Sequence, residues 1–161
     1  MANEDKGTTL VVPSFRLCGE LHLSRVAFEN AMSRMHETQN LVPANYSSLE
    51  YVIQESWREC RNNAIKVGSE LRKADQNIEE IKADIILDEI PELLKDKPKS
   101  ANNADFRKAV MARSTDYADS LEHSGKLIAL LAHFESNMKT MENTSRFVKK
   151  QMDYIIRQGR G

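Results

Sequence analysis

The chain has 161 residues, which is enough for one domain or for a short element beside one domain. Charged residues make up 29% and aromatic residues 6%, a balance that favours a helical rod with a thin apolar seam over a thick globular core. The net charge of −1 excludes a general attraction to nucleic acid, so any such binding has to depend on local basic clusters. Two cysteines are too few for a disulfide framework, which fits a reducing cytoplasm.

The first 45 residues are expected to form an N-terminal arm followed by a short helix. No apolar run follows the polar start, so no secretory signal is expected. Alternating apolar residues predict a strand that pairs with a second copy or lies on the helices, although a helix starting near Gly19 is an alternative. The alternating residues are Phe15, Leu17, Leu21 and Leu23. We expect a helix from about Ser24 to Gln39 and then a turn at 40–45, where Pro43 blocks helix continuation.

Between Ser48 and about Leu94, apolar residues recur in steps of four and three without a break. The positions are Ile53, Trp57, Cys60, Ala64, Val67, Leu71, Ala74, Ile78, Ile81 and Ile85. This repeat predicts a narrow apolar stripe along one side of a helix. A helix of that length, on the order of 70 Å, needs an equally long partner to bury its stripe. Ser47 or Ser48 is expected to cap its start, and Pro91 to end or bend it at Ile90.

A polar tip at 95–101 separates this helix from the rest of the chain. Asn102 is expected to cap a short helix at 103–112, because an acid stands three residues further on, as in a weak capping box. This helix carries Phe106 and Val110 on one face.

A start signal at 114–116 precedes a second apolar seam, which has one three-residue stutter near Phe134 and ends before Gly159. Its positions are Tyr117, Leu121, Ser124, Ile128, Leu131, Phe134, Met138, Met141, Ser145, Val148, Met152 and Ile155. Two long seams joined by a short tip predict an antiparallel helical hairpin. The expected fold is therefore all-α, with residues 1–45 as the arm and residues 46–161 as the hairpin.

Additional apolar residues beside the second seam have no use in a two-helix hairpin. We interpret them as the surface of a homo-oligomer larger than a dimer, because exposed apolar patches mark interaction sites. They are Leu127, Leu130, Phe147 and Ile156.

No pattern typical of an enzyme or of a metal or cofactor site is present. The four histidines have no carboxylate or cysteine at metal-ligand spacing, and no glycine-rich loop is available to hold phosphates. No apolar stretch approaches the roughly 18 residues that a membrane span requires.

The charges are unevenly distributed along the chain. Acidic residues gather at 75–92, whereas basic residues gather at 95–113 and from residue 139 to the end. These clusters are either solvated faces with some cross-helix pairing or, repeated around a ring, a continuous basic track for single-stranded nucleic acid.

Five features of the second half of the chain occur in a characteristic order. They are the segment Lys82–Ile90, a tip with proline and lysines, the segment Asn103–Val110, the pair Asp116 and Tyr117, and a long helix that includes 146–150. This order resembles the phage recombination mediators of the UvsY type over about residues 65–158. The resemblance implies a cytoplasmic, ring-forming helical protein that binds single-stranded DNA. Such proteins help a RecA-like recombinase to displace single-strand-binding protein.

The chain departs from the family where two basic residues are expected near the end of the first long helix. The lysine is present as Lys82, but the arginine is replaced by Asp84, which moves the expected DNA contacts toward the two basic clusters. The expected DNA-binding residues are Lys82, Arg107, Lys108, Arg113, Arg146, Lys149 and Lys150. The alternative is a non-enzymatic coiled-coil interaction protein, either a scaffold or an inhibitor that presents the acidic run 75–92 to a host nuclease.

Overall fold

The structure is a computed structural model that describes residues 9–13 and 20–159. Its elements in chain order are β1 (Thr9–Pro13), β2 (Glu20–Ser24), α1 (Val26–Ser33), η1 (Met35–Asn40), α2 (Pro43–Asp84), η2 (Ile85–Glu89), α3 (Ile90–Leu93), η3 (Lys99–Ala101), α4 (Ala104–Arg113) and α5 (Thr115–Gln158). Of these, η1 and η3 are 3₁₀ helices, and η2 is a π-helical turn.

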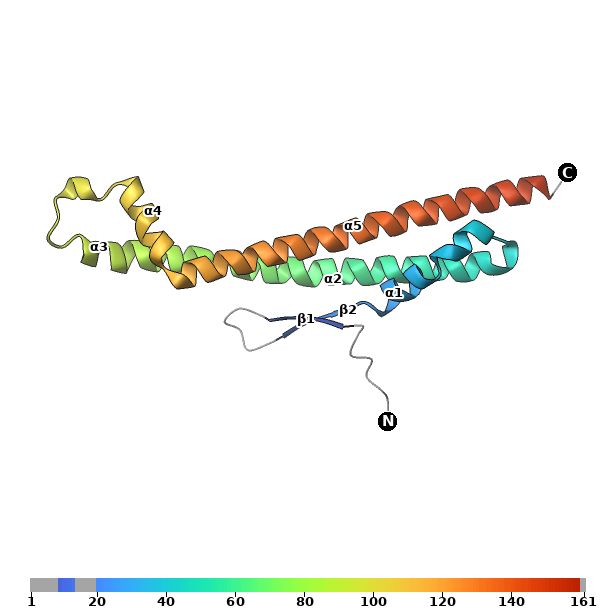
Figure 1. Ribbon diagram of the computed structural model, residues 1–161, viewed down its shortest axis with the longest axis horizontal. Helices are drawn as coiled ribbons and strands as arrows, with labels where there is room; N and C mark the ends of the chain where they lie inside the picture. The colour runs from blue at the N-terminus through green and yellow to red at the C-terminus, as the bar shows by residue number, and fades with distance from the viewer. Residues whose placement is uncertain (1–8, 14–19, 160–161) are drawn as a thin grey trace, which may run out of the picture. The chain divides into compact units, whose positions relative to one another are not determined.

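The chain divides into two compact units, each containing part of α2 and part of α5 (Figure 1). Unit 1 comprises residues 1–67 and 130–161, and unit 2 comprises residues 68–129. The boundary expected after residue 45 does not coincide with this division, because the N-terminal elements belong to the same unit as the adjoining helix segments.

The prediction of an all-α fold with long packed helices is confirmed, with a small sheet in addition. In unit 1, α2 and α5 share a core cluster that contains Ile53 and Val148. In unit 2 the paired residues include Asn77 with Ser120. Residue numbers on α5 fall as those of their partners on α2 rise, so the paired segments in each unit run antiparallel.

All ten positions predicted for the first seam are buried or half-buried. By contrast, Ile65 on α2 lies off the seam and is 59% exposed. The predicted stripe is therefore buried along its length, and hydrophobicity alone does not decide which residues of α2 are buried. In unit 1, α2 also buries residues outside the stripe, namely Leu49, Val52, Ser56 and Asn63.

The second seam follows a different set of residues from the predicted set. Leu121 and Ile128 are exposed, whereas Ser120 and Leu127 are each only 1% exposed. With these two in place, one unbroken series of buried or half-buried positions alternates in steps of three and four, so the predicted stutter does not exist. The series is 117, 120, 124, 127, 131, 134, 138, 141, 145, 148, 152 and 155. Leu127 thus belongs to the chain's own seam, which corrects its assignment to an oligomer surface.

Hydrogen bonds explain why two serines occupy the seam of α5. Asn77 Nδ2 donates to Ser120 Oγ at 3.0 Å, and Ser124 Oγ donates to an oxygen of Asp75 at 3.1 Å. Each buried hydroxyl therefore has a partner, so its burial carries little desolvation penalty.

The first long helix begins earlier than expected, and its geometry changes just before Pro91, where an end or a bend was expected. It starts at Pro43, a favoured first position because the missing N–H has no partner there in any helix. The Val42 N–H donates to Asn45 Oδ1 at 2.9 Å, which makes Ser47 and Ser48 interior residues rather than caps. Before Pro91 the helix widens into η2, as expected for a proline that removes one backbone hydrogen bond, and α3 then continues to Leu93.

The short helix after the tip is capped one residue later than predicted. The Asn103 side chain accepts a hydrogen bond from the Phe106 N–H, whereas Asn102 accepts one from the Arg107 side chain. Ser114 caps α5 by accepting a bond from the backbone N–H of Tyr117.

The N-terminal strand does have a partner within the chain. β1 and β2 pair antiparallel, with Thr9 opposite Ser24 and Pro13 opposite Glu20. Of the two expected placements of this strand, pairing with a second copy is therefore wrong. Contact with the helices is present, because Lys66 Nζ on α2 donates to the His22 carbonyl of β2 at 3.3 Å. Phe15, Leu17 and Gly19, which entered that expectation, lie outside the described residues. The predicted helix at 24–39 is present as α1 followed by η1.

A carboxylate from α2 caps the N-terminus of α1, which has no capping side chain of its own. Glu59 accepts hydrogen bonds from the Ala27 and Phe28 N–H groups at 3.2 and 2.9 Å and from the Ser24 hydroxyl at 2.6 Å. One turn further along α2, Asn63 Nδ2 donates to the Ser24 carbonyl at 2.7 Å. An anion at a helix N-terminus accepts hydrogen bonds from N–H groups that have no partner in the helix, and it interacts favourably with the positive end of the helix dipole. Glu59 therefore anchors α1 to α2.

Replacing Glu59 by alanine is expected to lower the free energy of unfolding by about 1–3 kcal/mol, because two backbone donors lose a charged acceptor. Urea denaturation measures this loss, and amide hydrogen exchange should accelerate at Ala27 and Phe28. Glu55→Ala is the matched control, since within the described residues Glu55 pairs only with the exposed Arg58 on its own helix. Equal losses in the two variants would contradict the capping role.

Cys60 is buried on the seam, and burial, with a smaller contribution from Glu59, raises the pKa of its thiol to about 11. Because the thiolate is the reactive form, we expect Cys60 to react with a thiol reagent at pH 8 at least about a hundredfold more slowly than an unperturbed cysteine. Peptide mapping after brief alkylation tests this, with the urea-unfolded protein as the control. Rapid labelling of native Cys60 would show that the seam opens there.

Candidate nucleic-acid interface

The four predicted DNA-binding residues in unit 2 are not equally available. A hydrogen bond from Lys82 to Glu79 at 2.6 Å raises the pKa of Lys82 and occupies its ammonium group. Arg107 Nε donates to Asn102 at 2.8 Å. Lys108 and Arg113 are exposed on α4. Unit 2 therefore offers two exposed cations on one short helix beside two that already have partners.

In unit 1, α5 carries a band of exposed cations, which we call the basic band. It consists of Lys139, Arg146, Lys149, Lys150 and Arg157. Helical spacing places Lys139, Arg146, Lys150 and Arg157 on the side of α5 away from the seam, over a length of about 27 Å. Lys149 lies at the edge of this band, toward α2. Among the residues that the structure describes, Arg146, Lys150 and Arg157 have no carboxylate partner. Their charges are thus available to a ligand.

Two exposed aromatic side chains lie beside the basic band. Phe147 and Tyr154 are 48% and 58% exposed, and their spacing of seven residues puts them on the same side of α5. Each is three or four residues from Lys150, which is neighbouring distance on a helix surface. The band therefore combines positive charge with rings on which bases can stack.

Lys149 differs from its neighbours because it contacts a buried carboxylate. Glu50 is 8% exposed, and its Oε1 accepts hydrogen bonds from Gln54 Nε2 and Ser145 Oγ, both at 2.8 Å, while Lys149 Nζ lies 3.1 Å away. Of the predicted DNA contacts in unit 1, Lys149 is thus also a structural residue. Sequence reasoning missed Glu50, although its position three residues before Ile53 continues the seam and marks an acid at a buried site.

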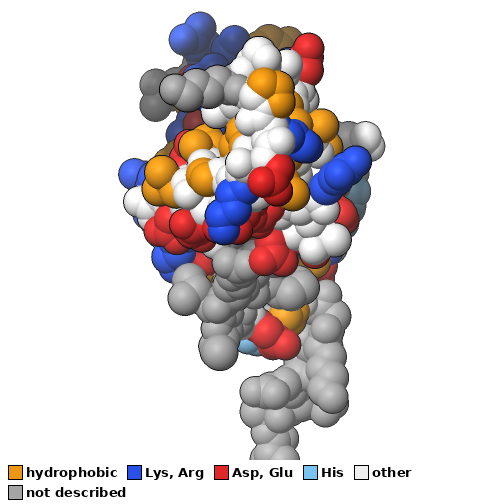
Figure 2. All heavy atoms as spheres, turned by 90° about the vertical axis from the view of Figure 1, so that its left-hand side faces the viewer, with side chains coloured by type: hydrophobic (Ala, Val, Ile, Leu, Met, Phe, Trp, Pro, Cys, Tyr) orange, Lys and Arg blue, Asp and Glu red, His pale blue; other side chains and the backbone are white. Residues whose placement is uncertain are grey.

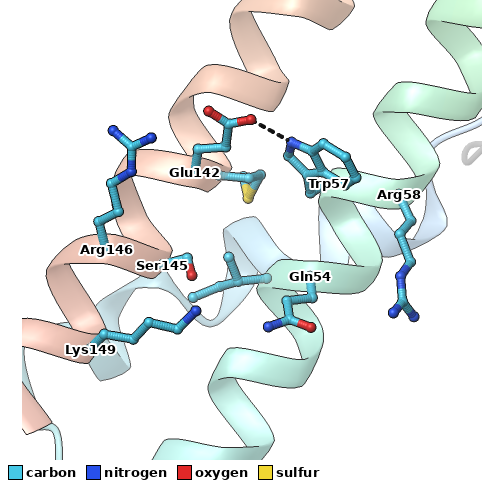
Figure 3. Close-up of a pocket in the computed structure, with 9 residues that line it drawn as sticks. Gln54, Trp57, Arg58, Glu142, Ser145, Arg146 and Lys149 are labelled. Atoms are coloured by element: carbon cyan, nitrogen blue, oxygen red, sulfur yellow. Dashed lines mark hydrogen bonds between the residues drawn. The ribbon is translucent and has the colours of Figure 1, made fainter.

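A cavity of about 420 Å³ lies between α2 and α5 in unit 1, next to the basic band. Its lining residues are Ile53, Gln54, Trp57, Arg58, Met141, Glu142, Ser145, Arg146 and Lys149. Figure 3 shows Lys149 and Ser145 reaching toward Gln54, whereas Arg58 points away from the others. The Trp57 Nε1–H donates to Glu142 at 3.1 Å, which fixes the indole ring at the cavity wall. Sequence reasoning assigned Trp57 to the seam alone.

The predicted oligomer residues do not form one surface. Leu127 is buried and Leu130 is half-buried, whereas Phe147 and Ile156 are exposed. The last two are nine residues apart, which is half a turn around a helix, so they lie on opposite sides of α5.

Residues 9–13 and 20–159 contain neither a candidate metal site nor a membrane-spanning helix. No three histidine, cysteine or acidic side chains there are grouped so that they could hold a metal ion. Within the same residues, no helix has both the length and the apolar character needed to cross a membrane. Comparisons of the chain with known protein families, with curated proteins and with solved structures found no significant match.

Proposed function

We propose that the protein is a phage recombination mediator, a non-enzymatic homo-oligomer that binds single-stranded DNA in the cytoplasm of the host cell. It promotes loading of a RecA-like recombinase in place of single-strand-binding protein. The observation that carries the proposal is the basic band with its exposed neighbours Phe147 and Tyr154. Single-strand binding without sequence preference depends on this combination of phosphate-binding charge and base stacking.

A titration of a fluorescent oligonucleotide at two salt concentrations tests the proposal. We expect binding at low salt with little sequence preference. The affinity should fall with a log–log slope of roughly 0.7 per phosphate contact on a single strand, because each contact releases counterions. Absence of binding even at low salt would rule out the mediator.

For assembly we propose contact with a second copy through Leu121 and Ile128, which take the place of Leu127. They are exposed in unit 2 and lie seven residues apart on the same side of α5. Gly125 lies between them. No atom lies within 4 Å of the place where its Cβ would be, so the chain itself leaves room for an alanine there. Glycine is nevertheless present, although in a helix it costs about 1 kcal/mol relative to alanine. A large apolar residue lies on each side of this glycine. In a two-fold contact both copies use the same patch, so Leu121 of one copy can meet Ile128 of the other. A further contact through Phe147 or Ile156 extends the dimer to a larger ring.

Light scattering on the purified protein is expected to give a mass several times the 18.4 kDa of one chain. The double substitution Leu121→Asp and Ile128→Asp should lower that mass, because burying two unpaired charges at a contact is costly. Ile65→Asp, an equally exposed site on α2, should leave it unchanged. A parent mass near 18.4 kDa at micromolar concentration would contradict the proposed assembly.

A second candidate function, inhibition of a host nuclease, is favoured by an acidic surface in unit 2. The exposed acids are Glu79, Glu80, Asp84, Asp88, Glu89 and Glu92. Leu87 is 71% exposed in the same segment. Figure 2, which views the side that carries α3 and α4, shows apolar side chains among charged ones. This candidate replaces the first if the low-salt titration detects no DNA binding while the protein slows nuclease activity in host extract.

A further inference from the structure

We infer that the cavity between α2 and α5 in unit 1 holds one base of the bound single strand, placed against the indole of Trp57. This inference rests on the proposed binding of single-stranded DNA and assigns a particular contact to it. The volume of about 420 Å³ is sufficient for a nucleobase with its sugar. A base-binding site needs a space of the right size beside a surface that binds the DNA backbone. The cavity provides this space.

The inner part of the cavity is apolar and contains an aromatic ring. Ile53 and Met141 are fully buried beneath it, and Trp57 is half-buried at its wall. The Arg61 guanidinium lies over the indole, 5.5 Å from its centroid, and the bond to Glu142 holds the ring edge. Because its orientation is fixed before binding, Trp57 provides a stacking surface at low cost in side-chain entropy.

Polar groups at the cavity provide hydrogen bonds for the edge of a base. Gln54 contributes an amide and Ser145 a hydroxyl, from opposite helices (Figure 3). Gln54 Nε2 and Ser145 Oγ each already donate to Glu50, which leaves the second N–H and the oxygen of the Gln54 amide and the lone pairs of the Ser145 oxygen for a base. One donor and two acceptors can still meet the edge of any of the four bases. The site thus predicts stacking with little discrimination between bases.

The basic band places the backbone of the strand beside the cavity. Arg146 lies on the cavity rim and belongs to the band, and Lys150 follows one turn later on α5. A phosphate at Arg146 and the next at Lys150 would leave one base beside the opening. A polynucleotide therefore satisfies the charge and the cavity together, which a neutral aromatic ligand does not.

Trp57 is the single tryptophan of the chain and therefore reports directly on the cavity. Adding an oligothymidylate to the full-length protein should quench its fluorescence in parallel with the anisotropy of a labelled strand. An abasic strand of equal length should bind more weakly, by roughly 5- to 150-fold, and should quench little, since it lacks the base that stacks. Thymidine monophosphate at the same nucleotide concentration should not quench the fluorescence. If it quenches as strongly as the strand does, the cavity is a site for free nucleotides and the inference is overturned.

Two variants separate this contact from the rest of the interface. Trp57→Ala should reduce the preference for the normal strand over the abasic strand to what Phe147 and Tyr154 provide, and Trp57→Phe, which keeps an aromatic ring, should retain most of the parent's preference. Both should bind the abasic strand like the parent, which also verifies that they are folded. If the parent binds DNA without quenching and Trp57→Ala keeps the parent's preference for the normal strand, the cavity inference is overturned and the proposed function stands. If the parent binds neither strand, both are overturned.

Discussion

Replacing Arg146, Lys150 and Arg157 together by alanine is expected to weaken single-stranded DNA binding by about tenfold to a hundredfold at low salt. The log–log salt slope should become shallower by about 2, because three phosphate contacts are lost at roughly 0.7 each. These three side chains are exposed, and none has a carboxylate partner within residues 9–13 and 20–159, so the fold should be unaffected. Anisotropy titrations at several salt concentrations measure both quantities.

Lys149 is left unchanged in this variant for a structural reason. Its ammonium lies 3.1 Å from buried Glu50, and removing it would leave that carboxylate without its cation, at a cost of several kcal/mol. The control is Arg72→Ala, Lys73→Ala and Lys126→Ala, which changes the net charge equally at exposed sites in unit 2. Equal weakening by both triple variants would mean that total charge, rather than the basic band, determines binding.

Ile78→Asp is expected to have the largest effect on stability. Ile78 is 6% exposed on the first seam, so the substitution places an unpaired carboxylate in an apolar stripe. The expected loss is about 3–5 kcal/mol of the free energy of unfolding, a large part of the stability of a chain of this size. Circular dichroism during thermal and urea unfolding measures it, and helix content should fall sharply.

Ile65→Asp is the matched control, since it makes the same change on the same helix at a side chain that is 59% exposed. It should change the free energy of unfolding by no more than about 0.5 kcal/mol. If Ile78→Asp is as helical and as thermostable as this control, residue 78 does not lie on a buried seam.

Part of the candidate interface was predictable from charge alone. Arg146 and Lys150 were expected from the basic cluster and are exposed without carboxylate partners among the described residues. Lys82 and Arg107 were expected on the same ground, but their bonds to Glu79 and Asn102 depend on local geometry that charge counts do not reveal. The cavity at Trp57 was not predictable, because it forms only when segments far apart in the sequence pack together.

The helical class, the buried seam of α2 and its antiparallel pairing with a second long helix were predictable from the amino-acid pattern. These follow from local periodicity, since a repeat of 3.5 specifies one side of a helix whatever lies against it. The predicted stripe of α5 is wrong at Leu121 and Ile128. Ser120 is buried in place of the more hydrophobic Leu121, and the buried position one heptad later is therefore Leu127.

Only the tertiary structure decided which polar groups are buried and what satisfies them. Ser120 is buried because Asn77 lies opposite, and α1 begins where it does because Glu59, more than thirty residues away, accepts its first N–H groups. The pairing of β1 with β2 and the contact of Lys149 with Glu50 are of the same kind. A hydrogen bond requires its partner at about 3 Å, and residues distant in sequence meet at that distance only once the chain has folded.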